Sequence, residues 1–206
     1  MLWWLLPIFA LSLNAQDWGG LHLFNADIPL DKKWTLQIHA RMRTNENFSH
    51  FFQRRGGPIV FYQAKPRLAL VGGYYSLNEE NGERVDWNFH RYWGGFLATP
   101  VRTPKFTLEA RTLGEKFVNA PSGDFLRVRQ RMLGVWGRGQ WRPYVQAEGL
   151  VAQGHWTGRW TAGAQYWPEG RNFFATLGYE YRMNPNGTHI HLIASTLQFR
   201  LRKLKS

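Results

Sequence analysis

Arginine alternates with apolar residues in the segment Phe125–Trp136, whose sequence is FLRVRQRMLGVW. Arginines stand at 127, 129 and 131, and the positions between them are apolar except for one glutamine: Leu126, Val128, Gln130 and Met132. Successive side chains of a β-strand point to opposite faces, so a strand here has one charged and one largely apolar face. A helix would scatter the arginines around its circumference. The segment therefore predicts a sheet whose charged face needs acidic partners, anions or water.

The same alternation continues along most of the chain, and it is clearest in the segment 34–43. No segment has the sustained 3.6-residue period of an amphipathic helix. We expect ten strands, many of them longer than the usual five or six residues, at 34–43, 51–63, 67–77, 85–98, 106–115, 125–136, 144–151, 156–167, 175–182 and 193–201. This pattern predicts an all-β fold, an antiparallel up-and-down barrel of ten strands, with WGGLHLF (18–24) lying before the barrel. Twelve strands are the alternative, if WGGLHLF is itself a strand that spans the membrane and a further strand is hidden in 51–63.

Two places interrupt the alternation. Gly56-Gly57-Pro58 suggests a bulge or bend, because glycine and proline weaken the pairing of a strand interior. The alternation also slips at His90-Arg91, where a bulge would keep Arg91 off the apolar face.

The composition favours a barrel whose apolar face meets lipid. Aromatic residues make up 16% of the chain and charged residues only 19%, which is aromatic-rich and charge-poor for a soluble domain. Several aromatics stand near expected strand ends, as in the interfacial girdles of membrane barrels. Mid-strand apolar positions include small residues such as Ala40, Ala162 and Ala164, which lipid tolerates better than a core that must be filled. The polar face carries arginine and glutamate with little lysine, as expected of paired and partly buried charges. These features predict a transmembrane barrel; a soluble periplasmic ligand-binding barrel is the alternative.

The start of the chain, MLWWLLPIFALSLNA, is apolar and too short to span a bilayer as a helix. Asn14-Ala15 before Gln16 is typical of a signal-peptidase site. We therefore expect a signal peptide at 1–15 and one barrel domain at 16–206. The expected location is the bacterial outer membrane, where the partners are outer-membrane lipid and, during biogenesis, the barrel-assembly machinery, and the protein is a monomer. The net charge of +12 comes without any nucleic-acid-binding motif, so nucleic acid is not an expected partner.

The polar faces of the expected strands define a predicted lumen charge network: Arg41, Arg43, Glu109, Arg111, Arg127, Arg129, Arg131, Glu148, Arg159, Glu180 and Arg182. Unpaired charges in a narrow lumen are costly, so we expect arginine–glutamate pairing. The expected partners of the arginine-rich strand are Glu109 on the preceding strand and Glu148 on the following one. The network is either a structural plug or, because arginine exceeds carboxylate, the lining of a narrow anion-favouring pore.

Catalytic signals are weak. A membrane-embedded acyl hydrolase needs serine and histidine with an acidic or amide partner, and the candidates are Ser195 and His191, without a GxSxG elbow. His189 and His191 could form half of a metal site, but no third ligand is evident. We therefore expect no enzyme activity, no catalytic residue, no metal and no cofactor, and keep a lipid-modifying enzyme as the alternative.

Three segments carry a family resemblance: LEARTLGEKFV, DFLRVRQRMLG and RPYVQAEGLV. With an early tryptophan and the arginine-ending segment QIHARMR, they resemble a bacterial outer-membrane family known as domain of unknown function 2490. The resemblance covers most of the mature chain. It implies an outer-membrane β-barrel and no established activity.

Overall fold

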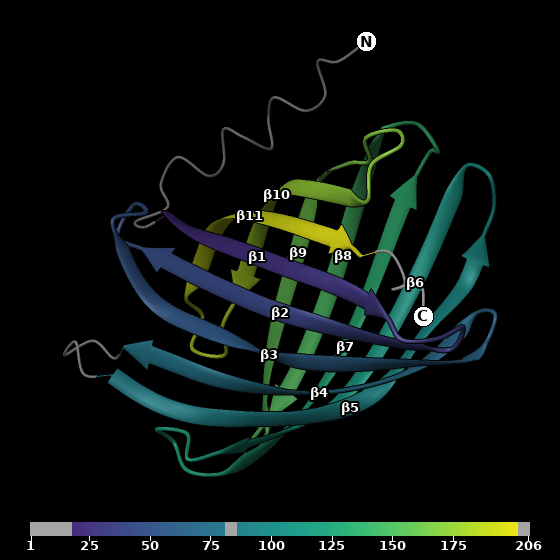
Figure 1. Cartoon of the computed structure of the whole chain (residues 1–206). Helices are drawn as coiled ribbons and strands as arrows, with labels where there is room; N and C mark the ends of the chain where they lie inside the picture. Colours follow the sequence, from purple (N-terminus) through teal and green to yellow (C-terminus); the bar gives the residue numbers. More distant parts are fainter. Residues whose placement is uncertain (1–17, 81–85, 202–206) are drawn as a thin grey trace.

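The computed structural model describes residues 18–80 and 86–201, and the predicted signal peptide lies outside them. The described residues form eleven strands in one closed barrel (Figure 1). Their bounds are β1 Trp18–Pro29, β2 Trp34–Asn45, β3 His50–Lys65, β4 Leu68–Glu80, β5 Asp86–Arg102, β6 Phe106–Val118, β7 Phe125–Trp136, β8 Trp141–Ala152, β9 His155–Tyr166, β10 Phe173–Met183 and β11 His189–Arg200. The all-β barrel is confirmed. No helix in this part of the chain is long and apolar enough to cross a membrane.

The strand β1 closes the barrel. It pairs antiparallel with β2 and parallel with β11, where Leu21 lies opposite Ala194. Every other neighbouring pair is antiparallel. An odd number of strands in an up-and-down order requires one parallel pair, so the start of β1 and the end of β11 lie at opposite ends of the barrel (Figure 1).

The predicted strand count needs correction. The segment WGGLHLF does not precede the barrel but belongs to β1, which makes eleven described strands and not ten. The alternative of twelve is also not what the structure has, because the region 51–63 lies within the single strand β3. The inward face of β1 carries Leu21, Leu23, Asn25 and Asp27, so its first half has no polar alternation that would mark it as a barrel strand.

The expected bulge at His90-Arg91 is absent, because β4 and β5 pair without a register shift and Arg91 lies opposite Tyr75. The segment 56–58 also keeps its register with β2. Gly57 is required there by close approach: a Cβ atom at this position would lie 2.1 Å from the carbonyl oxygen of Tyr74. Register shifts occur instead at Arg43/Thr44, Gln63/Lys65 and Ala98/Val101.

The outer wall of the barrel is apolar. Leu126, Trp141 and Leu177 are 70%, 66% and 61% exposed, although they stand within strands. Other large apolar side chains exposed on the strands include Phe24, Ile38, Val60, Leu70, Phe96, Val128, Met132, Val145, Val151 and Phe199. Single exposed apolar residues are ordinary on proteins, but a contiguous apolar surface around the molecule is not.

Polar side chains on the outer wall bind one another across strands. Gln130, the polar exception in the arginine-rich strand, is hydrogen-bonded to Thr112 of β6. His90 Nδ1 lies 2.8 Å from the hydroxyl of Tyr74. Each pair satisfies polar groups locally, between neighbouring strands.

Aromatic rings pair on the outer wall near both ends of the strands. At the end that holds the β7–β8 turn, Phe106 packs on Trp136 with centroids 5.1 Å apart, and Trp141 packs on Tyr166 at 4.7 Å. At the other end, Trp18, the first residue of β1, lies 5.9 Å from Tyr179. Aromatic pairs therefore stand near both ends of the strands, and Phe24, Phe96 and Trp160 add exposed rings nearer the middle.

Candidate functional site

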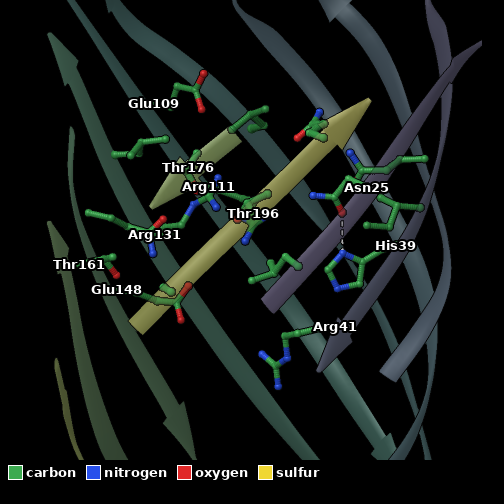
Figure 2. Close-up of a pocket in the computed structure, with 18 of the residues that line it drawn as sticks. Asn25, His39, Arg41, Glu109, Arg111, Arg131, Glu148, Thr161, Thr176 and Thr196 are labelled. Atoms are coloured by element: carbon green, nitrogen blue, oxygen red, sulfur yellow. Dashed lines mark hydrogen bonds between the residues drawn. The ribbon is translucent and has the colours of Figure 1, made fainter. Parts of the chain in front are cut away.

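The barrel interior gathers the predicted charge network. All eleven predicted residues line one or both of two interior cavities: Arg41, Arg43, Glu109, Arg111, Arg127, Arg129, Arg131, Glu148, Arg159, Glu180 and Arg182. The larger cavity has a volume of about 630 Å³ and the smaller about 310 Å³. Figure 2 shows Arg111, Arg131 and Glu148 near one another in the larger cavity, with Arg41 further along.

Five arginines line both cavities and so stand between them: Arg41 of β2, Arg55 of β3, Arg91 of β5, Arg129 of β7 and Arg159 of β9. We call this layer the arginine septum. Next to it, the inner faces of β3–β6 carry an apolar cluster that includes Tyr75, Trp93 and Leu113. The cluster fills part of the barrel interior with apolar side chains. The arginine septum is the polar part of the interior at this level.

Glu115 is the most enclosed carboxylate of the network. Its side chain is 0% exposed, and Arg127 Nη2 lies 2.5 Å from Oε2. Arg91 and Arg129 approach Oε1 at 3.7 Å and 3.6 Å. One carboxylate thus contacts three guanidinium groups, which come from the two strands that flank β6.

Glu148 provides the second centre. Arg129 Nη2 lies 2.5 Å from Oε2, and Arg159 Nη1 lies 3.1 Å from Oε1. Arg129 therefore bridges Glu115 and Glu148. A separate pair joins Arg182 Nε to Glu180 Oε1 at 2.6 Å. Charge-assisted bonds of this kind are strong where water is scarce.

The partners predicted for the arginine-rich strand are corrected in part. Glu148 contacts Arg129, but Glu109 forms no ion pair within 4.0 Å among the described residues. The register explains the difference, because Glu115 lies opposite Arg127 whereas Glu109 lies opposite Leu133. Glu115 has the same strand parity as Glu109, so extending the alternation past Gly114 would have found it.

Sequence reasoning also missed Arg55 and Arg91 of the septum. Arg55 stands directly before the Gly56-Gly57-Pro58 segment, where the alternation is obscured. Arg91 was placed at an expected bulge, but the continuous β4–β5 register points it inward. Arg91 is only 2% exposed, and its guanidinium stacks on Tyr75 at 4.6 Å.

Five interior arginines have no carboxylate within 4.0 Å in the described structure: Arg41, Arg43, Arg55, Arg111 and Arg131. Arg41 Nη2 donates a hydrogen bond to Gln53. Arg43 stacks on the ring of Phe52 at 4.6 Å, and Arg55 on Tyr75 at 4.8 Å. The interior therefore holds more positive charge than its carboxylates balance.

The serine and histidines considered for catalysis lie in β11, and the structure does not join them. Ser195 Oγ lies 2.8 Å from Nδ1 of His22 in β1, while His191 is bonded to the hydroxyl of Tyr179. His189 Nδ1 lies 2.7 Å from the hydroxyl of Tyr181. Within 18–80 and 86–201, no three histidine, aspartate or glutamate side chains gather as a metal site would need.

Replacing Arg129 with alanine is expected to lower the free energy of unfolding by about 3 kcal/mol, because two buried carboxylates lose their shared partner. The control is Arg200→Ala: Arg200 is exposed at the end of β11 and stacks on Trp167 at 4.9 Å. That change should cost less than about 1 kcal/mol. Denaturant unfolding of the folded protein measures both, and equal small effects would contradict a buried network.

The fold and its interior define a closed, mostly antiparallel β-barrel with an arginine-rich, carboxylate-bridged core. A family model described as "Protein of unknown function (DUF2490)" matches residues 18–193, and the chain belongs to this family. The sequence motifs' assignment to domain of unknown function 2490 is thereby confirmed. No curated protein and no solved structure matches the chain.

Proposed function

We propose that the chain spans the bacterial outer membrane as a monomeric barrel whose interior is a narrow, anion-favouring pore. The apolar outer wall is the main observation that supports a location in the membrane. Leu126, Trp141 and Leu177 project from strands into the surroundings, and water around the whole barrel would leave this apolar surface exposed. Lipid is the partner that such a wall fits.

Strand length and the aromatic pairs near the strand ends support the same proposal. The strands have 11 to 17 residues, enough to cross a bilayer when tilted. The pairs Trp141–Tyr166 and Trp18–Tyr179 fit the two interfaces of a membrane, where aromatic rings gather. A soluble periplasmic barrel, the alternative that the sequence left open, would have to cover this wall in another way.

The charge balance of the interior supports an anion-favouring pore. Among the described residues, ten interior arginines and Arg200 at the end of β11 line the two cavities, against five carboxylates, with Glu115 a sixth buried behind them. The positive potential favours anions, and the septum between the cavities makes any passage narrow.

Purified, folded protein in planar bilayers is expected to give a small conductance that favours chloride over potassium. The reversal potential in a potassium chloride gradient measures this preference. Glu148→Gln raises the positive charge of the lumen and should strengthen the preference. Absence of ion passage, or a preference for cations, would contradict the pore.

A lipid-modifying enzyme has less support. The contact between Ser195 and His22 on the outer wall is the one observation in its favour. Other outer-wall histidines make the same kind of bond to tyrosine hydroxyls, as His90 does with Tyr74. Mutual satisfaction of polar groups on an apolar wall accounts for all of these pairs.

A further inference from the structure

Two arginines of the septum stand directly opposite each other. Arg41 of β2 and Arg55 of β3 are partners in the register of these strands. Like charges opposite each other on one face of a sheet repel and destabilise it. Neither guanidinium has a carboxylate within 4.0 Å among the described residues, so nothing in this part of the chain neutralises the pair directly.

Both arginines are buried, with 9% exposure each. The Nε atoms of Arg41, Arg43 and Arg55 are buried and have no hydrogen-bond partner among residues 18–80 and 86–201. Arg55 lies opposite Arg41, and Arg43 follows Arg41 two residues further along β2 and lines the same smaller cavity. Buried donors on a charged group are normally satisfied, and leaving them unpaired costs free energy.

Beside these donors, His39 presents a ring nitrogen that has no hydrogen-bond partner among the described residues. It is 5% exposed and adjoins the arginines in the larger cavity. Its Nδ1 lies 2.7 Å from Asn25 Oδ1, as Figure 2 shows, while its Nε2 is buried without a partner. Because Asn25 Oδ1 can only accept, Nδ1 carries the proton and Nε2 of the neutral ring is an acceptor, which suits a protonated oxygen of an anion.

One described carboxylate, that of Glu79, lines the smaller cavity with these arginines, and it is already engaged. Glu79 Oε2 accepts a hydrogen bond of 2.5 Å from Gln53 Nε2. Gln53 in turn accepts the bond from Arg41. The glutamine therefore separates the carboxylate from the arginine, and the guanidinium groups remain free to bind another acceptor.

We propose that Arg41, Arg43 and Arg55 bind a small multivalent oxyanion such as phosphate or sulfate inside the barrel. Planar guanidinium groups match the oxygens of a tetrahedral anion, and two charges on the anion offset the repulsion between Arg41 and Arg55. Both cavities open onto Arg41 and Arg55, and Arg43 lines the smaller one, so an anion can arrive from either side. This site specifies which anions the proposed pore would hold. The proposal rests on the proposed function, because the pore is the route by which the anion enters.

The test titrates the full-length folded protein with inorganic phosphate at constant ionic strength, with chloride as the balancing anion. Binding to the folded state alone should raise the melting temperature, by roughly 5 °C at about a hundred times Kd. Chloride at the same ionic strength should give no comparable shift. Absence of a phosphate-dependent shift in the wild-type protein would overturn the proposal.

Arg55→Gln locates the site. It should abolish the phosphate shift, while the phosphate-free protein melts no lower than wild type because a like-charge contact is gone. Arg43→Gln should also abolish the shift, and it replaces the first variant if that one does not fold. Arg111→Gln is the matched control. Arg111 likewise lies opposite an arginine, Arg131, without a carboxylate within 4.0 Å in the described structure, but Glu109 and Glu148 line the same cavity as this pair and supply negative charge (Figure 2). This variant should keep the shift. Equal loss in Arg55→Gln and Arg111→Gln would show an unspecific charge effect and contradict the site.

The result of the phosphate titration can be distinguished from the result of the conductance measurement. A phosphate shift in a protein without conductance keeps the site and contradicts the pore. Conductance without a phosphate shift does the reverse.

Discussion

Glu115→Gln is expected to lower the free energy of unfolding by about 3–5 kcal/mol, the cost of breaking a buried ion pair by removing one partner. The Glu115 side chain has no exposed surface, and three arginines converge on it at 2.5–3.7 Å. Glutamine keeps the shape but removes the charge, so Arg127 loses its ion pair and Arg91 loses its carboxylate. Denaturant unfolding in detergent or lipid vesicles measures the change.

Glu109→Gln is the matched control. Glu109 stands on the same strand and the same face, lines the larger cavity and forms no ion pair within the described structure. Its replacement should change the free energy of unfolding by less than about 1 kcal/mol. If both variants unfolded alike, Glu115 would not be the centre of the network.

Leu177→Arg should cost about 2–4 kcal/mol if the outer wall faces lipid, which is the penalty for arginine near the bilayer midplane. Leu177 stands near the middle of β10 and is 61% exposed, so its replacement disturbs no packed core. Around a water-exposed wall the same substitution would be nearly neutral. Folding into lipid vesicles followed by denaturant unfolding measures the difference.

Leu30→Arg is the control for depth. Leu30 is 53% exposed and stands in the turn between β1 and β2, beyond the ends of the strands. Arginine there should cost less than about 1 kcal/mol, because it reaches the interface. Similar penalties at both positions would contradict a membrane-spanning middle.

The sequence alone predicts much of this barrel. Alternation with period 2 places a residue on one face, and Arg127, Arg129 and Arg131 illustrate how charges at every second position mark the interior. Gln130 falls on the opposite face and needs a local partner, which Thr112 provides. Strand parity is a local property, so it can be predicted without knowing the neighbouring strands.

Pairing between strands is not a local property. The predictions were wrong where the pairing determines which residues are in contact or which way a side chain points. The partner of Arg127 is Glu115 and not Glu109 because of the β6–β7 register. The strand β1 carries leucines on much of its inner face, and only its pairing with β11 and β2 reveals it as part of the barrel. Arg91 lies inward because its strand keeps its register where the sequence suggested a bulge.

Cell fractionation combined with heat-modifiable gel mobility tests the central claim most directly, because it decides which face of the strands meets water. The protein is expected in the outer-membrane fraction, and unheated samples should migrate differently from boiled ones because a folded membrane barrel resists detergent. Recovery in the soluble periplasmic fraction would contradict the account, since the apolar wall around Leu126 and Leu177 would then face water.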